Sequence, residues 1–584
     1  MRVSVILGLS GALGHDASAA LLVDGVTVAA AEEERFTRDK HAKGQLPLAA
    51  ARFCLEQAGL QGSDVQVIAF PYAAVSLLEP ARWQYALRHW YAPDRALDAL
   101  FNGNRRFRRL RARVHKLCAD LGIEWSRVRF EAVPHHLAHA SSAYHLSGYA
   151  GRTAILCIDG KGEYATTWFG WGEAAQMHCI RQFYDPDSLA GVYGAITQYL
   201  GFEMLDGEYK VMGMAPYGDP TRFDFSRLMQ LRDGALHVNT KLVNTVGRRR
   251  YKEHGEGFYF APALVRWLGP RRQGDAADEP YIHYAASMQK LYEDHSLALI
   301  EHHLRPVLEA GNGKLVFAGG GALNVKLNQR IVQLPYVREL FVQPAAGDAG
   351  TALGAATFVA ARDGMQVQPL QHVYLGPAYT SAVCEQALVA RAEVVHWRRM
   401  DDPAQRVADL LVKGHPVAWF QGRMEFGPRA LGGRSILGCP SVRGVADTIN
   451  AQIKFRERWR PFCPSMLGSV AQEMIEGQQP APYMTITFAM ADVWRRRLPE
   501  VVHEDGTARI QIVDATTHPR YHQLLCALEQ RTGYGVVLNT SLNRRGEPMV
   551  CSPADALNMF FASDLQFLAL EDLLVAKSAR DLDA

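Results

Sequence analysis

Short apolar runs separated by turn residues begin the chain and predict a group of β-strands. The runs are residues 3–9, 17–23, 26–31, 153–159 and 164–171. A turn of the sequence Asp24-Gly25 joins two of the early runs and is typical of a β-hairpin. The two later runs flank a second turn, residues 160–162, and helical stretches follow each group. The pattern therefore predicts two similar strand–hairpin–helix units.

Duplicated units with Gly and Asp in their turns are typical of the actin/sugar-kinase type of nucleotide-binding fold. This first region ends near Gly364, and the stretch that follows has two prolines and no helical period. A second α/β pattern then begins, with strands expected at 417–420 and 536–539. We therefore predict an α/β protein with domain 1–364, linker 365–380 and domain 381–584.

Length and charge limit the classes of function. A chain of 584 residues is too long for one core, and its 48% hydrophobic content is ordinary for a globular protein. The formal net charge is +3, so the chain as a whole is no polyelectrolyte binder. One basic run, residues 105–116, has Phe107, Leu110 and Val114 at helical spacing and predicts a solvated amphipathic helix. A patch for nucleic acid or an acidic substrate is the alternative.

Cysteine usage and the N-terminus bear on location. The nine cysteines include no C-x-x-C pair, which argues against a zinc ribbon, an iron–sulfur site or a disulfide framework. The first apolar run is too short and too polar for a signal peptide, and no apolar stretch of about eighteen residues occurs. We expect a cytoplasmic protein with neither a membrane nor a nucleic acid as partner.

Two histidines and two aspartates form a candidate metal site. His135 and His139 are four residues apart in a segment that favours a helix, so both imidazoles lie on one face. His136 lies about 100° away and is not expected to share the site. Asp159 and Asp348 lie in turns that follow apolar runs. This set suits Fe(II), Mn(II) or Zn(II) better than Mg(II). Ordinary helical histidines and turn-forming aspartates are the alternative.

A glycine-rich loop is the candidate nucleotide clamp. The run FAGGGALN leads from a strand through three glycines into a helix, where backbone N–H groups can approach a phosphate. The expected nucleotide-binding residues are Gly319, Gly320, Gly321, Asn324 and Asp348. His15, between two predicted strands, and Lys40 are candidates for contacting the substrate.

The second domain is rich in cationic side chains on loops with Gly, Pro and aromatic neighbours. Arginine forks on such loops match phosphate and carbamate oxygens bidentately, and a scatter of surface arginines is the alternative. The candidate residues are Arg423, Arg429, Arg434, Lys454, Arg456, Arg458, Arg460, Arg509 and Ser541.

Several motifs together resemble one known family. They are GHDASAALL, EEERFTRDKH, HHLAHA, EYKVMGMAPYG, GDAGTALGAA, FQGRMEFGPRALGGRSIL, KFRERWRPFCPS and LNTSLNRRGEP. In this order they resemble the O-carbamoyltransferases that tailor antibiotics and nodulation factors. The resemblance implies a first domain like the universal tRNA-threonylcarbamoyladenosine transferase subunit and a YrdC-like second domain.

The resemblance also implies a reaction. The second domain takes carbamoyl phosphate and ATP, releases phosphate and pyrophosphate, and forms carbamoyl adenylate. The first domain then transfers the carbamoyl group to a hydroxyl of a small molecule at an iron site, which releases AMP. The implied cofactors are Fe(II), or another divalent transition metal, and ATP with Mg(II).

The family's functional residues match positions in this sequence. By resemblance, the metal ligands are His135, His139, Asp159 and Asp348, and the residues on the substrate side are His15 and Lys40. The carbamoyl-phosphate and adenylate contacts are Arg429, Lys454, Arg460, Met484, Arg509 and Ser541. One departure is Lys161, which occupies a variable turn position beside Asp159.

Three other functions remain as alternatives. A tRNA-modifying enzyme would use the basic helix, a sugar or acetate kinase would use the nucleotide loops, and a binding protein would only retain nucleotide. AMP release that depends on carbamoyl phosphate separates them from the carbamoyltransferase. The sequence does not identify the acceptor, and it leaves the oligomeric state open, with a homodimer as one option.

Overall fold

The computed structural model divides the chain into two compact units. The structure describes residues 4–583 except 244, 245, 247, 248, 275–277, 392–394, 456, 458 and 478. Arg456 and Arg458 therefore lie outside the described residues. The first unit comprises residues 1–28 and 44–370, and the second comprises residues 29–43 and 371–584.

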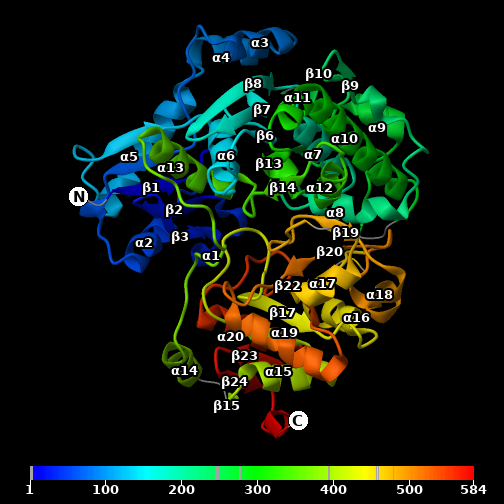
Figure 1. The fold of residues 1–584 in the computed structure, drawn as a ribbon. Coiled ribbons are helices and arrows are strands. Elements are labelled where there is room, and N and C mark those ends of the chain that lie inside the picture. Colours follow the sequence, from blue (N-terminus) through cyan, green and yellow to red (C-terminus); the bar gives the residue numbers. More distant parts are fainter. Residues whose placement is uncertain are drawn as a thin grey trace. The chain divides into compact units, whose positions relative to one another are not determined.

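The first unit begins with a five-stranded sheet of order β3-β2-β1-β4-β5 (Figure 1). Its strands are β1 (Val5–Leu9), β2 (Ser18–Val23), β3 (Val26–Glu32), β4 (Val67–Phe70) and β5 (Arg129–Ala132). β2 is antiparallel to β1, whereas β4 is parallel to β1 and β5 to β4. Asp24 and Gly25 have φ angles of 48° and 80°, the left-handed values that a type I′ hairpin turn requires.

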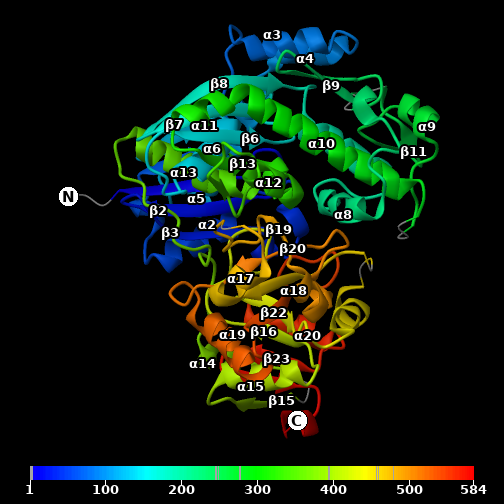
Figure 2. The same ribbon diagram turned by 45° about the vertical axis from the view of Figure 1, so that its right-hand side comes forward.

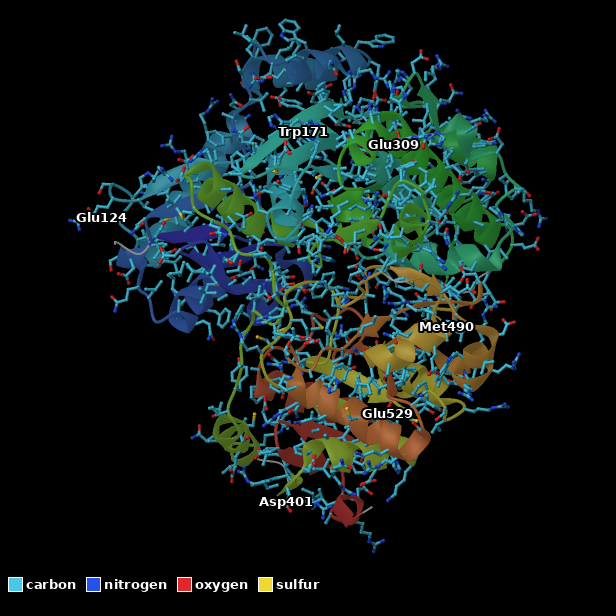
Figure 3. All side chains as sticks on the ribbon, in the orientation of Figure 1. Glu124, Trp171, Glu309, Asp401, Met490 and Glu529 are labelled. Atoms are coloured by element: carbon cyan, nitrogen blue, oxygen red, sulfur yellow. The ribbon has the colours of Figure 1, made fainter. Side chains whose placement is uncertain are left out.

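A second five-stranded sheet repeats this arrangement, with the order β8-β7-β6-β13-β14. Its strands are β6 (Thr153–Ile158), β7 (Ala165–Glu173), β8 (Gln176–Tyr184), β13 (Lys314–Ala318) and β14 (Glu339–Val342). β6, β7 and β8 are antiparallel in series, and β13 and β14 continue parallel to β6. Trp171, labelled in Figure 3, stacks on its cross-strand partner His178 at 4.1 Å. The predicted duplication is thus confirmed.

Two helices pack between the sheets. α6 (His135–Tyr144) follows the first sheet in the chain but packs on the second, and α13 (Thr351–Arg362) does the reverse. The two helices also pack on each other, and a Cβ atom at Gly354 would lie only 1.8 Å from the carbonyl oxygen of Ala138. Glycine is therefore required at this crossing, which sets how closely the two halves approach.

The remaining helices of the first unit surround these layers. They are α2 (Leu48–Gln57), α3 (Pro80–Arg88), α4 (Pro93–Asn102), α5 (Arg105–Asp120), α7 (Leu189–Tyr199), α8 (Glu208–Met214), α9 (Pro262–Leu268), α10 (Tyr281–His303), α11 (Arg305–Ala310) and α12 (Val325–Val332). The basic helix predicted at 105–116 is confirmed as α5, which buries Leu110 and Val114. No helix among the described residues is long and apolar enough to cross a membrane.

The second unit is built on an eight-stranded mixed sheet of order β15-β24-β23-β16-β17-β22-β18-β21. Its strands are β15 (His396–Arg399), β16 (Val417–Phe420), β17 (Arg434–Gly438), β18 (Cys463–Met466), β21 (Gln511–Ile512), β22 (Val536–Ser541), β23 (Phe567–Leu570) and β24 (Leu573–Ala576). Its main helices are α14 (Ser381–Val389), α15 (Pro403–Val412), α17 (Gly468–Met474), α19 (Pro519–Thr532) and α20 (Pro553–Phe561). β16 and β22 confirm the strands predicted at 417–420 and 536–539.

A short segment from the N-terminal part of the chain packs within the second unit. Residues 29–43 include α1 (Glu34–Thr37) and the buried Arg35, whose guanidinium lies 3.2 Å from Glu32 and donates to the carbonyl of Gly427 at 3.1 Å. Gly427 in turn donates its N–H to Glu32 at 2.8 Å. The predicted boundaries place this segment in the first domain. In the structure it belongs to the second unit, where the buried pair of Glu32 and Arg35 contacts Gly427.

Candidate functional site

Four buried side chains in the first unit meet at one point. His135 and His139 lie on α6, Asp159 follows β6, and Asp348 lies in the turn before α13. The Nε2 atoms of the two histidines are 3.2 Å apart, and Asp348 Oδ1 lies 3.4 Å from His135 and 3.6 Å from His139. Asp159 Oδ2 lies 3.6 Å from His135 Nε2. One ligand atom from each residue is within 4.8 Å of all the others.

Local structure explains why these residues converge. Pro134 precedes the first residue of α6, so the helix begins at His135 and presents His139 one turn later on the same face. The close crossing at Gly354 holds the start of α13, and with it Asp348, against this face. Each of the turns that supply the aspartates follows a strand, where parallel sheets usually hold their ligands.

Main-chain groups orient two of the four side chains in the cluster. The Nδ1 atom of His135 lies 3.3 Å from the carbonyl oxygen of Pro71, which leaves Nε2 to face the cluster. Asp159 accepts a hydrogen bond from the N–H of Gly320 at 2.9 Å through one oxygen and faces the cluster with the other. Outer contacts of this kind are typical of metal ligands.

The electrostatics of the cluster favour a cation. Burial alone would raise the pKa of Asp348, but His135, His139 and His15 outweigh it and hold that pKa well below its usual range. Burial lowers the pKa of His135, and the carboxylates of Asp348 and Asp159 outweigh this and raise it well above its usual value. Two buried carboxylates thus depend on nearby positive charge, which a proton or a metal ion supplies.

The spacing also fits one metal ion. Nitrogen and oxygen ligands about 2.1 Å from a transition metal lie about 3.0–3.4 Å from their neighbours. The distances of 3.2–3.6 Å within the cluster are close to this range. His136 is buried on the same helix but outside the set, and burial followed by the charge of His135 lowers its pKa to about 3.

His15 lies beside this cluster. Its Nδ1 atom is 3.0 Å from Asp16 Oδ2 and 3.8 Å from Asp348 Oδ2. Burial lowers the pKa of His15, but the hydrogen bond to Asp16 and the charge of Asp348 outweigh it and raise the pKa to about 9. Lys40, in contrast, lies in the short helix Lys40–Ala42 of the second unit. The substrate role of Lys40 stays a prediction.

The glycine loop adjoins the cluster through Asp159. Gly319 has a φ of 89°, and a Cβ atom there would lie 2.2 Å from the carbonyl oxygen of Ile158. The N–H of Gly320 is directed at Asp159, and Gly321 follows in the same turn. Asn324 caps α12 by accepting from the N–H of Leu327. The order of strand, glycines and helix is as predicted, the N–H of Gly320 contacts Asp159 of the cluster, and nucleotide binding by this loop stays a prediction.

Two residues near the cluster have contacts that the sequence pattern does not predict. Glu163 accepts hydrogen bonds from the N–H groups of Ala73 at 2.7 Å and His135 at 3.2 Å, so it fixes the start of α6. Lys161 was noted only as a turn residue, yet its Nζ lies 2.5 Å from Asp185. Their only sequence signal was their position shortly after Asp159.

In the second unit, the structure brings Lys454 and Ser541 together. Lys454 is buried, and its Nζ lies 3.2 Å from Ser541 Oγ, 2.8 Å from Asn543 Oδ1 and 2.9 Å from the carbonyl oxygen of Asn543. The Lys454 ammonium is thus surrounded by oxygen atoms at the C-terminal end of the buried strand β22.

Of the other predicted second-unit residues, Arg509 is linked to this position through β18 and β22. Arg509 ends β20 (Thr507–Arg509), and its Nε donates to Cys463 Sγ at 3.1 Å. Cys463 pairs across β18 and β22 with Asn539, two residues before Ser541. The three remaining residues are Arg460, which pairs with Glu457 at 3.4 Å, Met484, which is buried, and Arg429, which is partly buried between β16 and β17.

Two arginines that the sequence suggested as phosphate ligands instead bind main-chain carbonyl groups. Arg434 is fully buried, lies 3.6 Å from the ring centroid of Phe420, and donates to several main-chain carbonyls, including that of Pro377 at 3.0 Å. Arg423 donates to the carbonyl of Gly376 at 3.1 Å. Both guanidinium groups therefore hold the end of the predicted linker within the second unit.

Glu425 was also missed. Its buried carboxylate accepts from the N–H groups of Leu431 at 2.7 Å and Gly433 at 2.6 Å. This residue organises the glycine-rich loop that bears Arg429.

Comparisons with known proteins agree with this picture. Residues 5–357 match the family profile described as carbamoyltransferase N-terminus, and residues 408–577 match the one described as carbamoyltransferase C-terminus. An uncharacterised protein of Synechocystis sp. is 36% identical over 98% of this chain and 97% of its own length. Nodulation protein NolNO of Sinorhizobium fredii is also 36% identical, over 98% of this chain and 82% of its own length. Among solved structures, full-length HypF in its phosphate- and nucleotide-bound form covers 62% of this chain and 56% of its own at 11% identity, with a TM-score of 0.28, which is too low to support an argument.

Proposed function

The chain belongs to the carbamoyltransferase family, and from this premise we propose that it is an ATP-dependent O-carbamoyltransferase acting on a hydroxyl of a small natural product. The observation that carries the proposal is the buried cluster of His135, His139, Asp159 and Asp348, with His15 beside it. It provides a place to hold an activated carbamoyl donor next to an acceptor.

The donor would be made in the second unit, as a YrdC-like domain. Water would hydrolyse carbamoyl phosphate to carbamate and inorganic phosphate, and the carbamate oxygen would then attack the α-phosphate of ATP and displace pyrophosphate. The product, carbamoyl adenylate, has a good leaving group, whereas free carbamate is a poor electrophile. Lys454, Arg460 and Arg509 would hold the anionic reactants, and Lys454 lies beside Ser541, another predicted contact of the adenylate.

Transfer to the acceptor would take place in the first unit. The four-residue cluster would hold a divalent transition metal, with Fe(II) as the first candidate, since nitrogen and carboxylate donors are combined at suitable spacing. When bound, such an ion stabilises the negative charge that develops on the phosphate of the leaving group. Gly319 and Gly321, beside Asp159, would approach the nucleotide phosphate through their main chain.

His15 is the proposed base for the acceptor hydroxyl. With a pKa of about 9, raised by the hydrogen bond to Asp16 and by the charge of Asp348, its imidazole is mostly protonated at neutral pH. A cation held by Asp348 would remove part of this effect and lower the pKa of His15, which would favour its role as a proton acceptor. Asp16, at 3.0 Å, would keep the ring oriented.

Product analysis tests this function. The protein would be given ATP, carbamoyl phosphate and a panel of hydroxylated metabolites, and the nucleotides and acceptors would be analysed by mass spectrometry. We expect AMP, pyrophosphate and a carbamoylated acceptor, all dependent on carbamoyl phosphate, with Asp348→Asn as the inactive control for transfer. ADP as the product would indicate a kinase, and modification of added tRNA alone would indicate a tRNA-modifying enzyme.

A further inference from the structure

An apolar surface is concentrated on two outer helices of the first unit. α3 and α4 lie at its outer edge in both ribbon views (Figures 1 and 2). Of the seventeen large hydrophobic side chains that are exposed among the described residues, seven fall between residues 77 and 101. They are Leu77, Leu78, Trp83, Leu87, Trp90, Leu97 and Phe101. Such a concentration on one surface indicates an interaction site.

The spacing shows that these side chains form faces of helices. Trp83 and Leu87 are four residues apart and share the outward side of α3, and Trp90 follows two residues after the helix ends at Arg88. The opposite side of α3 buries Tyr85 and Ala86 against the unit. Because the inward face already anchors the helix, the fold does not need the outward face to be apolar. Trp90 is 76% exposed.

A basic helix follows directly. Residues 77–116 contain ten Lys and Arg but only three Asp and Glu, a surplus of seven positive charges, whereas the whole chain has a surplus of three. Arg105, Arg108 and Arg109 are exposed in the first turn of α5, within about 6 Å of one another along the helix axis. Phe101, on α4, is only four residues before them. Since α4 ends at Asn102 and α5 begins at Arg105, the chain keeps Phe101 within about 14 Å of Arg105.

We propose that residues 77–116 form a peripheral binding site for an anionic lipid bilayer surface. Exposed Trp, Phe and Leu side chains would enter the boundary between headgroups and acyl chains, and the arginines would pair with lipid phosphates. The lack of a long apolar stretch in the sequence predicts no membrane partner, but a site for a bilayer surface does not need such a stretch. Two other occupants fit less well. RNA leaves the aliphatic side chains in water, and a twofold dimer through this face would bring two basic helices together.

Vesicle cosedimentation with the full-length protein tests the site. We expect binding to vesicles of equal parts phosphatidylcholine and phosphatidylglycerol and little binding to phosphatidylcholine alone. Binding should weaken as salt rises from about 0.01 M to about 1 M, because the Debye length falls from about 30 Å to about 3 Å. Reversing the charge of Arg105, Arg108 and Arg109 to Glu should weaken it by at least about a hundredfold.

Matched variants separate this site from general effects. Leu87→Ser with Trp90→Ser should also reduce binding, and both residues are exposed, so the fold should persist. Reversal of three exposed arginines of the second unit, Arg443, Arg496 and Arg580, should leave binding unchanged.

Three outcomes would overturn the proposal. The first is that the protein does not bind anionic vesicles at low salt. The second is that reversal of Arg443, Arg496 and Arg580 weakens binding as much as reversal of Arg105, Arg108 and Arg109. The third is that the protein self-associates through this surface without binding vesicles, and that Leu87→Ser with Trp90→Ser abolishes the self-association. Tighter binding to tRNA than to vesicles would assign the surface to RNA instead. Carbamoyl transfer to a soluble acceptor should be unchanged in all these variants, so failure here is distinct from failure of the proposed function.

Discussion

The Nδ1 atom of His135 lies 3.3 Å from the carbonyl oxygen of Pro71, the residue that follows β4. This contact favours the tautomer with a proton on Nδ1, so the lone pair of Nε2 faces the other three side chains of the cluster. A residue that follows a strand of the first sheet thereby orients His135 toward Asp159 and Asp348, which follow strands of the second sheet. Metal binding should therefore depend on the orientation of the His135 ring as well as on the charges of Asp159 and Asp348.

Removal of one ligand should abolish metal binding. In His139→Ala, the set loses a buried nitrogen donor, and the affinity for a divalent transition metal should fall at least about a hundredfold, beyond the usual effect of an outer-contact mutation. Elemental analysis of purified protein measures this directly, and carbamoyl transfer should be lost as well. His136→Asn, on the same helix but outside the set, should retain the metal. Active wild-type protein without a transition metal would contradict the assignment.

His15→Asn should separate the two half-reactions. The variant retains a similar polar volume but cannot accept the proton of the acceptor hydroxyl, so transfer should stop. Formation of carbamoyl adenylate should continue, because Lys454 and Arg509 belong to the other unit. ATP–pyrophosphate exchange dependent on carbamoyl phosphate measures this retained activity. Loss of exchange in this variant would show that the division of labour is wrong.

Arg509→Ala should have the opposite effect. Loss of one charge-assisted contact to an anionic reactant costs about 2–4 kcal/mol of transition-state stabilisation, a fall of about thirtyfold to a thousandfold in the rate of adenylate formation. Transfer from chemically supplied carbamoyl adenylate should stay nearly intact. Arg496→Ala, an exposed arginine of the same unit, is the matched control. Equal losses in both assays would instead indicate a single shared site.

Acid should destabilise the second unit through His518. This buried side chain caps α19 by accepting from the N–H of Tyr521, and burial lowers its pKa from 6.5 to about 4. Because the folded-state pKa lies below the unfolded one, its contribution is complete above pH 6.5 and is lost as the pH falls to about 4. The loss is at most about 3 kcal/mol.

His518→Asn provides the comparison, since asparagine also caps helices but does not titrate. Thermal unfolding followed between pH 7 and pH 4 should show a smaller decrease of stability in the variant. Identical pH dependence in both proteins would exclude His518 as the source.

Some features could be predicted because they follow from local sequence. Asp24-Gly25 determines a type I′ turn by its backbone preferences alone, and the four-residue spacing of His135 and His139 determines a shared helical face. The duplication of strand order was recognisable for the same reason, since each half repeats one local pattern.

Other features depend on contacts that no local pattern records. Arg434 and Arg423 resemble phosphate ligands in sequence, but distant main-chain carbonyls at Pro377 and Gly376 take up their donors. Glu425 is one acidic residue among many until the fold directs amide groups at its carboxylate. The partners of a long polar side chain are thus decided by tertiary structure.

The position of residues 29–43 has a consequence for how the protein is made. This segment leaves the ribosome more than three hundred residues before Gly427, whose main chain pairs with Glu32 and Arg35. Domains usually fold in the order of their synthesis. Here part of the second unit is translated first and cannot pack until the later residues of that unit have been synthesised. A gene split at residue 371 would separate the buried ion pair from its acceptor. A polypeptide that begins at residue 371 would therefore lack the segment whose Glu32 and Arg35 contact the main chain of Gly427.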